Sequence, residues 1–172
     1  YLFSKHPKIG DFDVCPVLKN RTTYSKFFPK CNLKFSGSAG FLLSPKAVPF
    51  AEKFKIGGVP FARGIENEEF SGNVAGFPSG CDMFLSQTLE FYTPILPQYN
   101  LNGHFFANGA ISANLRSNNF FDAVPQVSKA LTVGTGLVFV QNGMQIELNT
   151  QLPVHLSNEL NFVKFQFGIS PL

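Results

Sequence analysis

GMQIELNTQL, residues 143–152, alternates apolar and polar side chains over nearly its whole length. Its even-numbered residues are Met, Ile, Leu, Thr and Leu, and the odd-numbered residues from 145 onward are Gln, Glu, Asn and Gln. Successive side chains of a β-strand point to opposite faces, so this period of two predicts a strand with one apolar and one polar face. The preceding Asn142-Gly143 pair predicts a tight hairpin turn at its start.

Six further segments repeat the pattern, and together they predict an all-β chain of about seven strands. These segments are residues 11–19, 32–43, 83–93, 103–115, 131–139 and 163–170. Strands of globular proteins usually have about five or six residues, and most of these segments are longer. A tilted strand needs ~9–11 residues to cross a bilayer, so the lengths favour an antiparallel transmembrane β-barrel.

The composition also favours a membrane barrel. Charged residues make up 15% of the chain and 21 residues are Phe, whereas typical soluble domains have about 25% charged residues. No run of ~20 apolar residues predicts a membrane-spanning helix. The net charge of +3, with Lys and Arg spread along the chain, argues against a nucleic-acid partner. We therefore expect membrane lipid around the sheet, and a soluble β-sandwich binding module is the alternative.

Residues with reactive side chains are scattered along the chain. The three cysteines, Cys15, Cys31 and Cys81, form no CxxC pair, so we expect free structural thiols. The histidines are His6, His104 and His155, and no serine lies in a G-x-S-x-G setting. The acids Glu66, Glu68 and Glu69 are expected to form a solvated loop, because a calcium site needs more convergent oxygens. The sequence predicts no catalytic residues, no metal, no cofactor and no enzymatic activity.

Several motifs follow one another in a characteristic order. They are NLKFSGSAGFLL (32–43), VPFAEKFKIGGVPFARGI (48–65), LEFYTPILP (89–97), GHFFANGAI (103–111), VGTGLVF (133–139), MQIELNTQLP (144–153) and VKFQFG (163–168). This order resembles the insertase superfamily of outer-membrane β-barrels, and most closely the barrel core subunit of the mitochondrial sorting and assembly machinery. The resemblance implies that residues 1–172 are the C-terminal part of a bacterial-surface-antigen-type β-barrel domain, about seven strands of a sixteen-stranded barrel. An N-terminal polypeptide-transport-associated domain is not expected within this sequence.

The resemblance also implies a role for the Gly- and Arg-bearing stretch around Arg63. In the family this long loop folds back into the barrel, where its arginine meets the inner wall, and the implied partner is Asn108. A guanidinium has five donors and can hold a loop against polar side chains. Ile65 stands where the family usually has an aromatic residue. The implied anchor residues are Gly57, Gly58, Arg63, Gly64, Ile65 and Asn108.

The last predicted strand, expected over residues 161–170, is implied to form one side of a seam in the barrel. Its residues 164 and 166 are expected to face the lumen, and residues 163, 165 and 167 to face lipid. Gln166 and Gly168 match the start of the family's C-terminal sorting signal, whereas Pro171 cannot donate a ladder hydrogen bond. The implied seam and sorting-signal residues are Val163, Lys164, Phe165, Gln166, Phe167 and Gly168.

About seven strands cannot close a barrel, and an open sheet in lipid leaves backbone groups unpaired at two edges. We therefore expect the missing N-terminal half of the barrel, or another chain, to complete the sheet. The resemblance implies folding and insertion of β-barrel precursors into the mitochondrial outer membrane, with precursor polypeptides and other subunits of a membrane complex as partners. The alternatives are a structural barrel subunit without insertase activity, motivated by Ile65 and Pro171, or another translocation channel of the superfamily.

Overall fold

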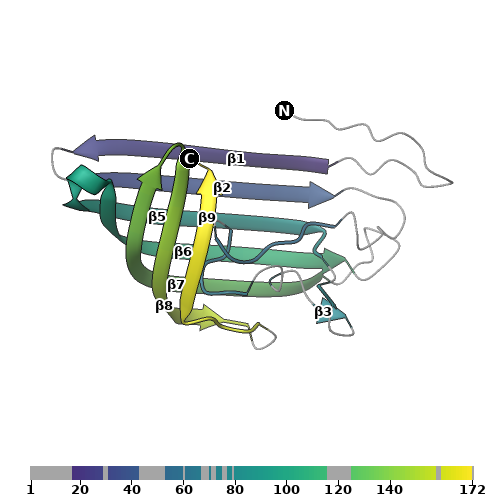
Figure 1. The fold of residues 1–172 in the computed structure, drawn as a ribbon. Coiled ribbons are helices and arrows are strands. Elements are labelled where there is room, and N and C mark those ends of the chain that lie inside the picture. The colour runs from purple at the N-terminus through teal and green to yellow at the C-terminus, as the bar shows by residue number, and fades with distance from the viewer. Residues whose placement is uncertain are drawn as a thin grey trace.

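Seven strands form one antiparallel sheet in which each strand pairs with its neighbours in the chain (Figure 1). The computed structural model describes residues 17–28, 31–42, 53–59, 61–66, 70, 73–74, 77–78, 80–115, 125–157 and 160–171. The strands of this sheet are, in spatial order, β1 (Val17–Phe28), β2 (Cys31–Leu42), β5 (Met83–Leu96), β6 (Leu101–Leu115), β7 (Pro125–Gln141), β8 (Met144–Leu156) and β9 (Phe165–Pro171). The predicted all-β fold, a portion of an antiparallel barrel, is confirmed.

Short elements occupy two of the connections. A two-stranded pair, β3 (Asn73–Val74) and β4 (Phe77–Pro78), lies in the connection from β2 to β5, and a 3-10 helix, η2 (Pro97–Tyr99), joins β5 to β6. Asn142 and Gly143 both have positive φ and connect β7 to β8, as the hairpin prediction required. Among the described residues, no helix is long and apolar enough to cross a membrane.

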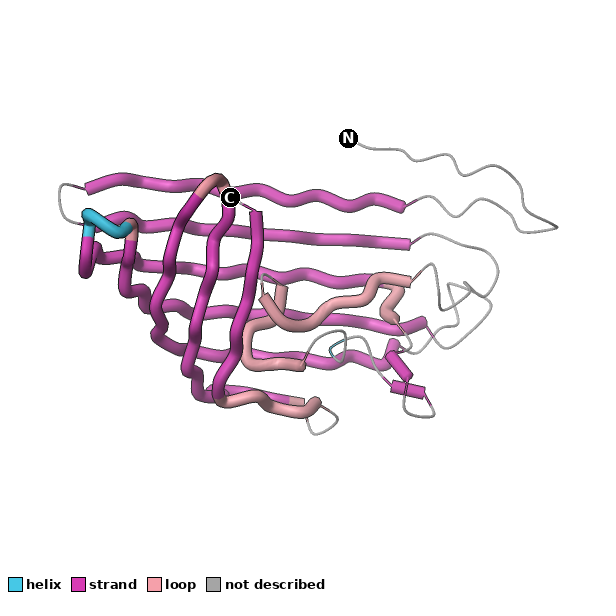
Figure 2. The backbone as a smooth tube through the Cα atoms, viewed as in Figure 1, coloured by secondary structure: helices cyan, strands magenta, loops and turns pink. Residues whose placement is uncertain are grey.

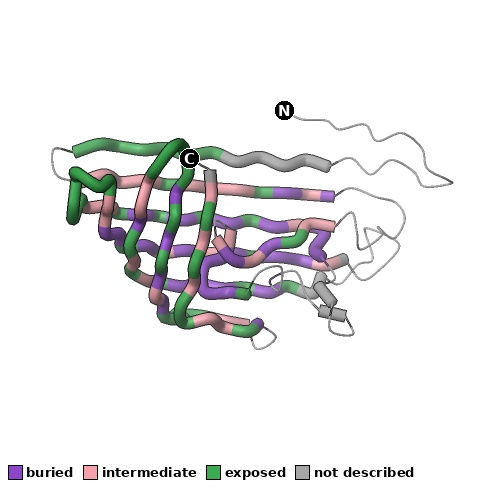
Figure 3. The backbone as a smooth tube through the Cα atoms, in the orientation of Figure 1, coloured by how far each residue is buried: buried purple, intermediate pink, exposed green. Residues whose placement is uncertain are grey.

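In this sheet the apolar side chains are exposed and the polar side chains are buried, the reverse of a soluble protein. Leu148 of β8 and its partner Phe167 of β9 are 56% and 64% exposed, whereas Glu147, next to Leu148 in the chain, is 1% exposed. Figure 3 shows the same alternation of buried and exposed positions along the strands. The buried polar residues of the strands are Ser86, Thr88, Glu90, His104, Asn108, Ser112, Ser128, Thr132, Gln145, Glu147, Asn149 and Gln151. An apolar convex face and a polar concave face are what a barrel in lipid requires.

The sheet curls strongly, so β8 and β9 cross in front of the first strands in the view of Figure 1. Two glycines of β7, Gly134 and Gly136, lie where the neighbouring strands leave no room for a side chain. A Cβ on Gly134 would lie 2.5 Å from both Phe106 Cζ and Thr150 O. Glycine therefore allows the sheet to bend here, since larger side chains would push the neighbouring strands apart.

The connection from β2 to β5 fills the concave side of the sheet, and we call its described residues between 53 and 82 the inner loop (Figure 2). Its apolar side chains pack on the small residues Ala110 and Ala130 of the wall. Phe84 contacts Phe54 and Phe61 edge to face, at centroid distances of 5.0 and 6.0 Å. The buried cluster comprises Ile56, Ala62, Ile65, Phe70, Cys81, Phe84, Ala110, Ala130 and Leu160. Part of the barrel interior is thus a hydrophobic core and not an aqueous lumen.

Two strand predictions need correction. β1 extends to Phe28, well beyond the predicted segment, whose residues 11–16 lie outside the described part of the chain. β9 begins at Phe165 and not at residue 161. Just before it, Lys164 O still accepts from Gln151 N of β8, but Val163 N donates to Gly64 O and Val163 O accepts from Gln151 Nε2. The segment before β9 therefore contacts the inner loop.

The cysteines that the structure describes are free thiols. Cys31 is half-buried and Cys81 is buried, while Cys15 lies outside the described residues. Burial raises the pKa of Cys81, at the end of the inner loop, to about 12, so this thiol stays protonated at neutral pH.

Candidate functional site

The inner loop is bound to the wall through its backbone between Phe61 and Ile65. On β5 and β6, Ser86 Oγ and Asn108 Nδ2 donate to Phe61 O. Thr132 Oγ1 of β7 donates to Arg63 O over 2.8 Å. β9 is the fourth strand to contribute, since its Gln166 accepts from Gly64 N and donates to Ile65 O. Buried backbone groups need partners, and here the wall supplies them in place of a neighbouring strand.

Asn108 bonds the segment from Phe61 to Arg63 through both the oxygen and the nitrogen of its side-chain amide. Its Oδ1 accepts from Arg63 N at 3.1 Å, while its Nδ2 donates to Phe61 O at 3.3 Å and to Thr88 Oγ1 at 2.6 Å. The implied Arg63–Asn108 contact is therefore made by the backbone of Arg63. The guanidinium points to other partners.

The Arg63 guanidinium forms ion pairs with two buried carboxylates. Its Nη2 lies 2.7 Å from Glu90 Oε1 on β5 and 2.9 Å from Glu147 Oε2 on β8, and its Nε lies 3.3 Å from Glu147 Oε2. All three residues are at most 3% exposed. The Phe106 ring lies under the guanidinium, with its centroid 5.0 Å from Cζ. Burial acts to lower the pKa of Arg63, but the two carboxylates raise it above its ordinary value, so the group remains charged.

Further side chains complete the shell around each carboxylate. Glu147 accepts from Asn149 Nδ2 at 2.9 Å and from Gln145 Nε2, its neighbours on the concave face of β8. Glu90 accepts from the Tyr92 hydroxyl at 2.9 Å, and Lys34 Nζ lies 3.7 Å away. These donors stabilise the ionised carboxylates where water is excluded.

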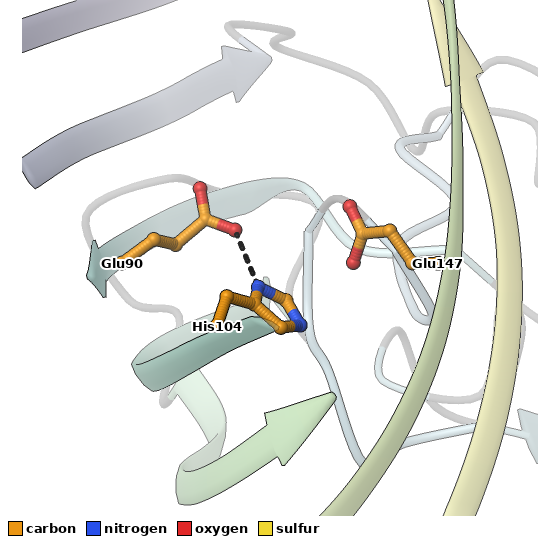
Figure 4. A group of neighbouring side chains, drawn as sticks. All are labelled: Glu90, His104 and Glu147. Atoms are coloured by element: carbon orange, nitrogen blue, oxygen red, sulfur yellow. Dashed lines mark ion pairs between the residues drawn. The ribbon is translucent and has the colours of Figure 1, made fainter. Parts of the chain in front are cut away.

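His104 joins the same cluster from β6 (Figure 4). Its Nε2 lies 2.7 Å from Asn149 Oδ1, and its Nδ1 lies 3.8 Å from Glu90 Oε1. Asn149 uses its Nδ2 on Glu147, so its Oδ1 faces the ring and Nε2 is the nitrogen that donates. His104 therefore supports the Glu147 site through Asn149, while its Nδ1 lies near Glu90 without a hydrogen bond. His155 is exposed, and His6 lies outside the described residues.

Glu90, His104 and Glu147 have ligand atoms within 4.8 Å of one another, a spacing that a metal ion could use (Figure 4). The Arg63 guanidinium, however, bridges both carboxylates and supplies the positive charge that such a cluster needs. The chemistry of the site is therefore that of a buried ion-pair network. Of the acidic loop residues named above, Glu66 is exposed, and Glu68 and Glu69 lie outside the described residues.

Gly64 and Gly58 have left-handed backbone conformations, with φ of 86° and 66°. Gly57, at φ 155°, is nearly extended. A Cβ on Gly64 would lie 3.0 Å from both Phe162 Cε2 and Thr132 Cγ2. Gly64 thus lies in a narrow gap between the wall and the segment before β9.

Gly64→Ala is expected to destabilise the protein by at least about 1–2 kcal/mol, the cost of a left-handed conformation for a residue with a Cβ. The contacts with Phe162 and Thr132 add to this cost. The measurement is the urea midpoint of unfolding in detergent micelles. Gly37→Ala is the matched control, because a Cβ there has its nearest neighbour, Thr22 Oγ1, at 3.6 Å. Equal midpoints for the two variants would contradict the prediction.

The structure brings the anchor residues and part of the last strand together. Gln166 bonds Gly64 N and Ile65 O, and Gly168 lies against Val59 of the inner loop. Phe165 and Phe167 are exposed on the convex face, where lipid was expected. Lys164 directly precedes the strand and is exposed, with Nζ 5.9 Å from the Phe165 ring centroid. Val163 is half-buried and contacts the inner loop through its backbone.

The family model described as the Omp85 superfamily domain matches residues 15–171, nearly the whole chain. No curated protein sequence matches it.

Proposed function

Because this chain belongs to the Omp85 superfamily of outer-membrane β-barrels, whose members insert or translocate proteins, we propose that it inserts β-barrel precursors into the mitochondrial outer membrane. In this proposal it is the barrel core of the sorting and assembly machinery. Its partners are precursor polypeptides, membrane lipid, other subunits of the complex, and the strands that complete its sheet. It is proposed to act without enzymatic chemistry or a cofactor.

The observation that carries the proposal is the position of β9. This strand lies at one end of the described sheet and pairs with β8 over seven positions, from Phe165 to Pro171. A strand at a sheet edge offers backbone groups to which an extended segment can add. A precursor strand would pair at this seam by exchanging one set of backbone hydrogen bonds for another. The free energy for insertion would then come from the folding of the precursor itself.

Depletion of the protein tests the proposal. Assembly of newly imported mitochondrial porin, a β-barrel, is expected to fall severalfold, with the precursor remaining sensitive to added protease. An outer-membrane protein anchored by a single helix serves as the control, because its insertion needs no strand pairing. Normal porin assembly in depleted mitochondria would count against the proposal.

A second candidate is a structural barrel subunit that holds a membrane complex together. It is favoured by Ile65, which is fully buried where the family usually has an aromatic, and by Pro171 in the last strand. For a scaffold, depletion should disperse the complex on native gels while porin that is already bound assembles at the normal rate. A third role is another translocation channel of the superfamily. In that case depletion would change neither the complex on native gels nor the assembly of porin.

A further inference from the structure

The two nitrogens of the His104 ring have different surroundings. Nε2 donates to Asn149 Oδ1 at 2.7 Å, so Nδ1 carries the lone pair of the neutral ring. Nδ1 has no hydrogen-bond partner, although His104 is 0% exposed. The atom that it faces is itself an acceptor, Glu90 Oε1 at 3.8 Å (Figure 4). Two buried acceptors that face each other are satisfied only by a cation that both can bind.

The Nη2 atom of Arg63 lies where the two carboxylates converge. It is 2.7 Å from Glu90 Oε1, and 2.9 and 3.0 Å from the two oxygens of Glu147. Zinc binds carboxylate oxygens and imidazole nitrogens at about 2.0–2.2 Å, so these oxygens would close in by only about 0.5–1 Å around an ion at this point. Nδ1 of His104 belongs to the same group, because the ligand atoms of the three residues lie within 4.8 Å of one another. One imidazole and two carboxylates suit Zn²⁺ and similar transition metals better than Mg²⁺.

Hydrogen bonds behind these three residues orient them as the ligands of metal sites are oriented. A histidine that binds a metal through one nitrogen usually donates its other N–H to an oxygen of the protein. Asn149 accepts this bond from His104 and donates to Glu147 Oε2 at 2.9 Å. The Tyr92 hydroxyl donates to Glu90 Oε1, also at 2.9 Å. A single asparagine thus fixes the imidazole and one carboxylate, and leaves Nδ1 directed at the other carboxylate.

We infer that Glu90, His104 and Glu147 form a binding site for a divalent transition-metal ion, and that this ion and the Arg63 guanidinium exclude each other. Nη2 lies at the position that the ion would take, and either one supplies the positive charge that the buried carboxylates need. An ion that displaces the guanidinium removes its ion pairs from the inner loop. By linkage, the ion then favours release of the loop, and release of the loop favours binding of the ion. This inference does not depend on the proposed function.

The first experiment uses the Arg63→Ala protein in detergent micelles, with zinc chloride as the probe. Zinc is expected to raise its urea midpoint, because a ligand that binds the folded state stabilises that state. Adding His104→Ala should weaken zinc binding roughly a hundredfold or more, since loss of a ligand costs at least as much as loss of a group that orients one. Magnesium chloride at the same concentration should have little effect.

An unchanged midpoint, a zinc response that survives His104→Ala, or an equal response to magnesium overturns the proposal. If Arg63→Ala folds only when zinc is present, the site is supported. If it folds under neither condition, the decision falls to the second experiment, which needs no change at Arg63.

The second experiment uses the unaltered chain and tests the competition. Its zinc affinity is expected to be roughly a hundredfold below that of Arg63→Ala, the ratio that corresponds to breaking a buried ion pair. Saturating zinc should speed trypsin cleavage at Lys55, an exposed residue of the inner loop, severalfold. His104→Ala is the control, because any effect of zinc on trypsin itself persists in that variant. Unchanged cleavage of the unaltered chain, or a zinc affinity equal to that of Arg63→Ala, overturns the proposal.

Discussion

Arg63→Ala is expected to destabilise the protein by about 3–5 kcal/mol, the typical cost of removing one partner from a buried ion pair. The substitution leaves Glu90 and Glu147 buried without the guanidinium that bridges them. Lys34 is a weak replacement, because it lies 3.7 Å from Glu90 and contributes nothing to Glu147 in the described contacts. The measurements are the urea midpoint in micelles and the rate of trypsin cleavage at Lys55, an exposed residue of the inner loop. Both a lower midpoint and faster cleavage are expected.

Two companion variants separate charge from shape. Arg63→Lys keeps the charge but loses the planar fork, so it should fall between the wild type and Arg63→Ala. A variant that combines Arg63→Met, Glu90→Gln and Glu147→Gln removes all three charges and should recover much of the lost stability, as neutral replacements of buried ion pairs often do. An Arg63→Ala protein with the wild-type midpoint would contradict the buried network. A triple variant less stable than Arg63→Ala would show that the ionic contacts themselves hold the loop.

The direction of each strand face was predictable from the sequence because alternation is a local property. The alternation within Met144 to Leu152 defines the two faces of that strand without reference to the rest of the chain. The low content of charged residues and the length of the strands then indicate that the apolar face meets lipid. The part of β1 after Lys19 was missed because NRTTYSKFF does not alternate. The apolar region inside the barrel was missed because Ala110 and Ala130 are too small to mark a face as hydrophobic.

The partners of Arg63 were not predictable in the same way. Alternation assigned Glu147 to a polar face, yet Glu90 and Glu147 lie 27 and 84 residues from Arg63 in the chain. Their meeting depends on strand register and on the curl of the sheet, which brings β5 and β8 to opposite sides of one guanidinium. A usable signal was present nonetheless. Charged residues are scarce in this chain, and an acid on the concave face of a strand calls for a buried cation.

Gly136→Ala is expected to lower the free energy of unfolding by at least about 2 kcal/mol, because the added methyl group meets backbone atoms as well as side chains. Gly136 lies between His104 of β6 and Asn149 of β8 in the register of the sheet. Its Cβ would collide with Leu148 O and Asn149 Oδ1, and it would lie 2.8 Å from His104 Nε2. The His104–Asn149 hydrogen bond cannot survive in that space, and a carbonyl oxygen of the ladder can move only if β7 and β8 separate. The effect should therefore reach Glu147, which accepts from Asn149.

The measurement is again the urea midpoint, paired with trypsin cleavage at Lys55. Gly109→Ala on β6 is the control, because its Cβ meets only Leu131 Cδ1 at 3.7 Å, and its midpoint should stay within about 0.5 kcal/mol of the wild type. A lowered midpoint with faster loop cleavage would indicate that the wall and the inner loop form one cooperative unit. If Gly136→Ala matches the control in stability, β7 and β8 are not as close at this point as the register places them.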